Sequence, residues 1–166
     1  MKDSSNITKK LSESWLPIEE LNQISKTEAS FIRIPKIANI HIWMARRPCG
    51  VARILTLASV LPDHPLTREE FSELTGLNRA LKTKRGTIYM VTPSLNKIGA
   101  ILQKFGQNAK NITVVDPMAG GGSIPLESLR MGLKTVAIEY NPVAYLILKA
   151  TLEFPAKYAN NGLFEK

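Results

Sequence analysis

The spacing of apolar residues changes at about residue 111. Before it, apolar positions mostly follow helical spacing: those of 94–105 recur every three or four residues and predict a helix that ends at Gly106. The segment from Pro48 to about Leu61 is apolar on nearly every side, which predicts a buried helix that ends before Pro62.

After residue 111 the apolar residues form short runs typical of buried strands. Ile112–Val115 and Thr135–Ile138 predict two strands, and each is followed by a helical pattern, 123–131 and 142–154, the second ending before Pro155. A right-handed crossover would make the two strands parallel neighbours. We therefore expect an α/β fold: a partial Rossmann-like fold of order β-α-β-α with parallel strands, preceded by a mainly helical N-terminal segment.

Weaker signals predict the remaining elements. Thr67 and Glu70 form a capping-box pattern for a short helix that Gly76 would close, and Thr87–Thr92 has strand composition. Four regions follow: a disordered tail at 1–14, a helical basic segment at 15–110, a cofactor-binding half-domain at 111–158 and a tail at 159–166. No internal repeat is evident.

Composition excludes several classes of protein. The chain has 166 residues, 44% of them hydrophobic, and no apolar run reaches the roughly 18–20 residues of a membrane helix. Its start lacks the apolar stretch of a secretory signal, so we expect a cytoplasmic protein. Cys49 is the only cysteine, which excludes an internal disulfide, and we expect no metal site.

The net charge of +8 lies entirely before residue 112. A basic excess favours a polyanionic partner such as DNA, although a solvated basic surface explains it equally well. The densest cluster is 79–85, so its basic side chains are candidate DNA contacts. They are Arg79, Lys82, Lys84 and Arg85.

The segment 111–129, N-I-T-V-V-D-P-M-A-G-G-G-S-I-P-L-E-S-L, reads as strand, glycine loop and helix. Glycines let backbone N–H groups approach a ligand at a helix N-terminus. Glu139 lies 23 residues after Asp116, at the end of the next strand, where an acid can bind ribose hydroxyls. Asp116 would repel a pyrophosphate but suits the cationic amino-acid end of S-adenosylmethionine, and no G-K-[ST] follows. The plain alternative for the glycine loop is a tight turn. For Glu139 it is an acid that caps a helix or is solvated.

D-P-M-A-G-G-G-S resembles the cofactor motif D-P-F-x-G-x-G-[ST] of amino-directed DNA methyltransferases. Further segments, including L-P-I-E-E-L-N, I-H-I-W-M-A-R-R-P and N-P-V-A-Y-L-I-L-K-A-T-L-E-F-P, are similar to the large adenine-specific DNA methylases of archaea and bacteria. The N-terminal region of that family is a domain of unknown function of the DUF1156 type. The resemblance covers roughly 16–157.

The resemblance implies that the α/β part is a partial Rossmann-like methyltransferase fold, with S-adenosylmethionine as cofactor and DNA as partner. Asp116 and the glycines would line the methionine end, Glu139 would hold the ribose, and Tyr140 would lie against the adenine. The implied cofactor-binding residues are Asp116, Pro117, Met118, Ala119, Gly120, Gly122, Ser123, Glu139, Tyr140 and Asn141. Residues expected to border the cofactor pocket or a DNA cleft are His41, Trp43, Arg46, Arg47 and Pro48, for which core packing or solvation is the plain alternative.

The family's catalytic motif, [DNS]-P-P-[YFW], does not occur in this sequence. Its side chain and carbonyl position the target amine and its ring stacks on the flipped base. We therefore name no catalytic residue and expect a front half that is inactive alone, with a second chain supplying the remaining strands. The alternatives are a non-catalytic nucleic-acid-binding or regulatory subunit, a fragment of an RNA or protein methyltransferase, and a remnant without a partner.

Overall fold

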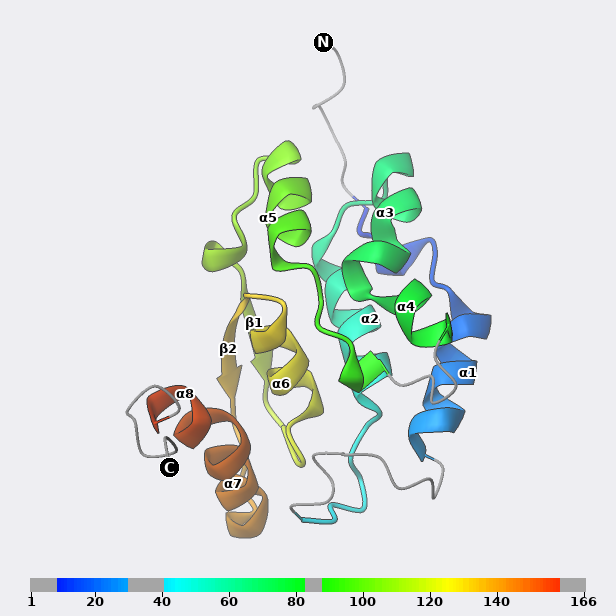
Figure 1. Cartoon of the computed structure of the whole chain (residues 1–166). Helices are drawn as coiled ribbons and strands as arrows, with labels where there is room; N and C mark the ends of the chain where they lie inside the picture. The colour runs from blue at the N-terminus through cyan, green and yellow to red at the C-terminus, as the bar shows by residue number, and fades with distance from the viewer. Residues whose placement is uncertain (1–8, 30–40, 83–87, 159–166) are drawn as a thin grey trace, which may run out of the picture.

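The computed structural model describes residues 9–29, 41–82 and 88–158 (Figure 1). The first part is helical, with α1 (Ile18–Ala29), α2 (Cys49–Val60), α3 (Pro65–Thr75), α4 (Leu77–Lys82) and α5 (Leu95–Lys104). The second part contains β1 (Thr113–Asp116), α6 (Ser123–Arg130), β2 (Lys134–Ala137), α7 (Pro142–Leu148) and α8 (Phe154–Tyr158). Short 3-10 turns lie at η1 (Leu11–Glu13), η3 (Ile88–Met90) and η4 (Ala109–Asn111), and η5 (Lys149–Glu153) is a π-helical turn.

The two strands are parallel and in register from Thr113 opposite Lys134 to Asp116 opposite Ala137, with α6 as the crossover. This confirms a mixed α/β fold with the predicted β-α-β-α order. The described residues form only these two strands, so the wider Rossmann-like sheet is an inference from the family resemblance.

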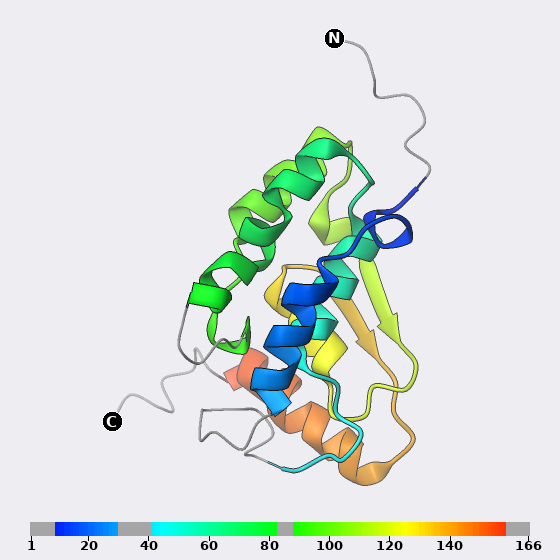
Figure 2. The ribbon, with the colours of Figure 1, turned by 90° about the vertical axis from the view of Figure 1, so that its right-hand side faces the viewer.

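In the described residues, only one face of this sheet is covered. Helix α6 packs against both strands, whereas the opposite face borders no other element in the side view (Figure 2). Val115 and Val136 are register partners on the open face and are 56% and 45% exposed. Apolar side chains this exposed on adjacent strands are typical of a surface that another element covers.

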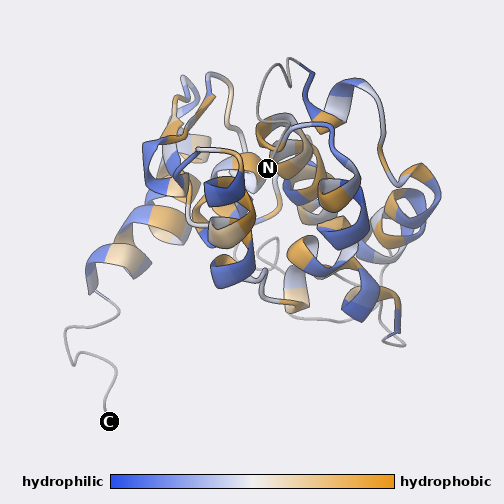
Figure 3. Ribbon diagram, turned by 90° about the horizontal axis from the view of Figure 1, so that it is seen from above, coloured by the Kyte–Doolittle hydropathy of each residue, from blue (hydrophilic) through white to orange (hydrophobic). Residues whose placement is uncertain are grey.

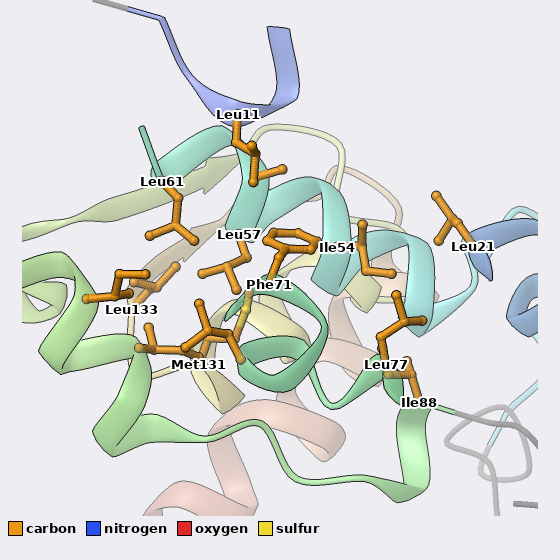
Figure 4. Packing of buried hydrophobic residues seen from close by; sticks show 14 of the residues in the cluster. Leu11, Leu21, Ile54, Leu57, Leu61, Phe71, Leu77, Ile88, Met131 and Leu133 are labelled. Carbon is orange, nitrogen blue, oxygen red and sulfur yellow. The ribbon is translucent and has the colours of Figure 1, made fainter. Parts of the chain in front are cut away.

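Helix α2 is central to the core, as its apolar sequence predicts. Its buried side chains belong to one hydrophobic cluster with apolar residues of α1, α3, α4 and α5, part of which Figure 4 shows. Most helices carry distinct hydrophobic and hydrophilic faces (Figure 3). Met131 and Leu133, which connect α6 to β2, belong to the same cluster. The core therefore continues across the predicted boundary at residue 110.

Helix α3 begins earlier than the capping-box pattern predicts. His64 is the N-cap: its Nδ1 accepts the Leu66 N–H at 3.2 Å, and the Thr67 hydroxyl accepts the His64 N–H at 3.1 Å. Pro65 at the first helical position has its φ already fixed for a helix, which explains the earlier start. The predicted end at Gly76 is confirmed, with φ of +76°.

The strand predicted at Thr87–Thr92 is wrong. Residues 88–90 form η3, and Ile88 is buried. The Tyr89 carbonyl accepts a hydrogen bond from Arg130 at 2.9 Å, and the Val91 carbonyl accepts one from Arg53 at 2.8 Å. Guanidinium groups thus satisfy backbone acceptors that a sheet would otherwise pair.

The prediction of a disordered tail at 1–14 is wrong for residues 9–14; residues 1–8 lie outside the described part. Leu11 is fully buried, and its N–H donates to the Leu61 carbonyl at 2.9 Å. The Asp63 N–H donates to the Lys9 carbonyl at 3.1 Å. One apolar side chain and a short backbone pairing therefore dock this segment beside the end of α2.

The last helix does not end at residue 154 as predicted. After α7 the chain widens into η5, where the Phe154 N–H donates to the Lys149 carbonyl, and α8 then continues to Tyr158. Pro155 offers no N–H and its ring crowds the preceding turn, so a wider turn before it lets the helical path continue. In the described part of the chain, no helix is both long enough and apolar enough to cross a membrane.

Candidate functional site

A pocket of about 460 Å³ lies at the carboxyl ends of β1 and β2. The glycine loop forms one wall, and the segment 43–47, which precedes α2, forms another. Its lining residues are Trp43, Ala45, Arg46, Arg47, Asp116, Met118, Ala119, Gly120, Gly121, Gly122, Ser123, Ile124 and Glu139. The segment 43–47 and the glycine loop, which lie more than 60 positions apart in the sequence, therefore meet at one site.

Backbone geometry shapes the loop between β1 and α6. The Asp116 carboxylate accepts the Met118 N–H at 3.2 Å, and the Ala119 N–H donates to the Ile138 carbonyl at 3.0 Å. Gly120 and Gly122 have φ of +49° and +79°, which side-chain-bearing residues rarely adopt. The loop is thus fixed to both strand ends, and glycine is required by conformation at two positions.

Glu139 has a role that its spacing did not predict: it fastens the glycine loop. One carboxylate oxygen accepts the Gly120 N–H at 2.6 Å and the other accepts the Asn141 N–H at 2.8 Å. The backbone hydrogen bonds from Asn141 and Gly120 lower the pKa of Glu139 below its ordinary value. Each oxygen retains a lone pair, so the carboxylate can still accept hydrogen bonds from ligand hydroxyls.

The segment 43–47 packs directly on the glycines. A Cβ at Gly120 would lie 2.8 Å from Trp43 Nε1, and a Cβ at Gly121 would lie 2.8 Å from Arg46 Nε. The Ser123 hydroxyl donates to the Arg47 carbonyl at 2.5 Å. Because Gly120 and Gly121 have no side chains, Trp43 and Arg46 can pack directly against the loop. Sequence reasoning did not predict this role of the glycines.

Arg46 is unusual among the described arginines. Its three guanidinium nitrogens are shielded from solvent and have no hydrogen-bond partner in the described part of the chain. Desolvation lowers the pKa of Arg46, with Cys49 and Glu28 acting in the opposite direction. The Glu28 carboxylate accepts the backbone N–H groups of Cys49 and Gly50 at 2.7 and 3.1 Å.

Some predicted site residues do not line the pocket. Tyr140 is fully exposed, Asn141 caps α7 through hydrogen bonds to the Val143 and Ala144 N–H groups, and Pro48 is the N-cap of α2. The remaining two are Pro117 and His41, both outside the pocket lining. Conversely, sequence reasoning omitted Gly121, Ala45 and Ile124; Gly121 was evident as the middle glycine of its run.

The two described residues of the basic cluster lie away from the pocket. Arg79 and Lys82 lie on α4 with exposed side chains, and the Arg79 guanidinium donates to the Thr92 carbonyl at 2.8 Å. Neither residue lines the pocket. Lys84 and Arg85 lie outside the described residues.

Comparison with known proteins matches only the N-terminal part. Residues 15–83 match a family described as a protein of unknown function, DUF1156, which supports the predicted N-terminal region. This match includes Trp43, Arg46 and Arg47 but ends before the glycine loop. No curated protein and no solved structure matches the chain. Residues 15–83 are therefore similar to the DUF1156 family.

Proposed function

We propose that the chain is the S-adenosylmethionine-binding front half of an amino-directed DNA methyltransferase that acts on adenine. The observation that carries the proposal is the pocket in which Asp116, the glycine loop and Glu139 meet the segment 43–47. A pocket at the carboxyl ends of parallel strands is the usual place for a nucleotide-like cofactor in open α/β sheets.

The residues of the pocket fit this cofactor. A volume of about 460 Å³ lies within the range of small-molecule sites, roughly 300–1,000 Å³. Asp116 supplies a negative charge for an ammonium group and Glu139 an acceptor for ribose hydroxyls, while Arg46 and Arg47 bring positive charge to the same pocket. Both signs of charge beside a glycine loop suit a zwitterionic amino-acid end better than a pyrophosphate.

S-adenosylmethionine, when bound, supplies a methyl group on a positively charged sulfur. Bound in this pocket, it would donate that methyl group to an exocyclic amine. The residues of this chain would bind and orient the donor. Positioning of the amine requires the second motif, which this sequence lacks.

A second chain is the partner we propose for the open face of the sheet. Val115, Val136 and Ile138 are 45–56% exposed there, as expected of strands awaiting further layers. DNA is the proposed substrate because of the family resemblance and the basic excess before residue 112.

Calorimetric titration of the chain with S-adenosylmethionine tests the cofactor assignment. We expect saturable binding that Asp116→Asn weakens, whereas Asp63→Asn, a change at an acid outside the pocket, leaves it unchanged. A methylation assay on DNA with the chain alone should show no turnover. Absence of binding would contradict the cofactor assignment, and turnover would contradict the proposed need for a partner.

A non-catalytic nucleic-acid-binding subunit is the second candidate. The close approach of Trp43 and Arg46 to the glycines favours it, because packing of segment 43–47 then explains the glycines without a ligand. DNA binding without cofactor binding would support this alternative. An RNA or protein substrate is distinguished by the same methylation assay on those substrates in the presence of the partner chain.

A further inference from the structure

Arg46 carries a positive charge that nothing in the described part of the chain neutralises through a hydrogen bond. Two other arginines differ: the fully buried Arg53 and the partly exposed Arg130 each form an ion pair with Glu127, at 2.6 and 2.7 Å. Shielding an unpaired guanidinium from water is unfavourable by several kcal/mol in typical cases. Because the buried guanidinium of Arg46 lowers the stability of the folded chain, we expect it to bind a ligand.

The position of Arg46 identifies the site of that ligand. Its side chain lines the pocket and lies against Gly121, where a Cβ would approach the guanidinium to 2.8–3.2 Å. Only glycine at position 121 allows the charge to come this close to the loop.

The ligand group must be an anion with hydrogen-bond acceptors that match a planar guanidinium, as a carboxylate does. Asp116 and Glu139 line the same pocket and would oppose a multiply charged anion such as a triphosphate. A single carboxylate beside an ammonium group satisfies both signs of charge.

We propose that Arg46 binds the carboxylate of the amino-acid end of the ligand in this pocket, while Asp116 faces its ammonium group. This inference rests on the proposed function, because S-adenosylmethionine is the ligand that carries both groups. It assigns to the DUF1156 region one wall of the cofactor site and a direct part in ligand selection.

The test compares two ligands that differ only in this carboxylate: S-adenosylmethionine and its decarboxylated form. We expect the chain to bind S-adenosylmethionine more tightly, and Arg46→Gln to weaken that binding by about 10- to 100-fold. The same substitution should leave the affinity for the decarboxylated ligand unchanged. Arg68→Gln, which alters an exposed arginine paired with Asp63, should change neither affinity.

Thermal unfolding without ligand distinguishes this role from a structural one. Arg46→Gln should leave Tm unchanged or raise it, because it removes a buried charge without breaking a hydrogen bond. A fall in Tm, or equal losses of affinity for both ligands, would overturn the role of Arg46 while leaving the proposed function intact. If the natural chain bound neither ligand, the proposed function and this inference would both fail.

Discussion

Arg53 of α2 and Glu127 of α6 form an ion pair at 2.6 Å in which both side chains are fully buried. The Arg53 guanidinium also donates to the Thr75 and Val91 carbonyls, and Glu127 also pairs with Arg130. This network joins the segment 15–83, which matches DUF1156, to the helix that follows the glycine loop. The two parts of the chain therefore form one folded unit around a buried charge cluster.

Breaking this pair should destabilise the whole chain. Arg53→Met leaves the Glu127 carboxylate buried with less compensation, which typically costs about 3–5 kcal/mol of unfolding free energy. Urea denaturation measures the loss. The exposed pair Arg68–Asp63 provides the control, since Arg68→Met should cost no more than about 1 kcal/mol. Equal effects of the two substitutions would show that the buried pair has no special role.

Substitution by alanine should change the stability of the chain in opposite directions at Gly122 and at Gly99. At Gly122, φ is +79° and a Cβ would lie 2.7 Å from Leu148, so Gly122→Ala should destabilise by about 1–3 kcal/mol. Gly99 lies within α5 with no atom within 4 Å of a Cβ, so Gly99→Ala should stabilise by about 0.5–1 kcal/mol. Denaturant midpoints of the two variants check the signs, and a stabilised Gly122→Ala would refute the loop geometry.

Glu139 should give the chain a pH-dependent stability. Its folded pKa is lowered by the Asn141 and Gly120 N–H groups, so its contribution is present above the ordinary pKa of about 4.5 and is lost as the pH falls through the folded value. The stability difference between the natural chain and Glu139→Gln should therefore be largest near neutral pH and shrink below pH 4.5. Denaturation curves across this range measure it; a constant difference would show that the charge of Glu139 does not hold the loop.

The basic cluster should act through phosphate contacts if it binds DNA. Replacing Lys82, Lys84 and Arg85 by Ala should flatten the dependence of log K on log salt by about 0.9 for each phosphate that these side chains neutralise. Fluorescence anisotropy with duplex DNA at several salt concentrations measures the slope. Lys134→Ala, which removes an exposed lysine from β2, serves as control. An unchanged slope in the triple variant would exclude the cluster as a DNA-binding surface.

The sequence determined the elements whose signals are local. The all-round apolar pattern predicts α2, short apolar runs predict β1 and β2, and the helical pattern that begins at residue 142 predicts the start of α7; the structure contains all four. The sharp loop after β1 could also be predicted, because a positive φ and a close approach of the backbone require glycine and therefore appear in the sequence.

Tertiary structure decided what depends on contacts between distant segments. Residues 88–90 form a 3-10 turn despite strand composition, because arginines from α2 and α6 take the carbonyls of Tyr89 and Val91. The sequence shows Glu139 as an acid at a strand end. Its hydrogen bond from the Gly120 N–H depends on the contact between two loops, which the sequence does not show. Likewise, no local pattern distinguishes the unpaired Arg46 from the paired Arg53. Partners that satisfy a charge are chosen by packing across the fold, and sequence spacing carries no record of them.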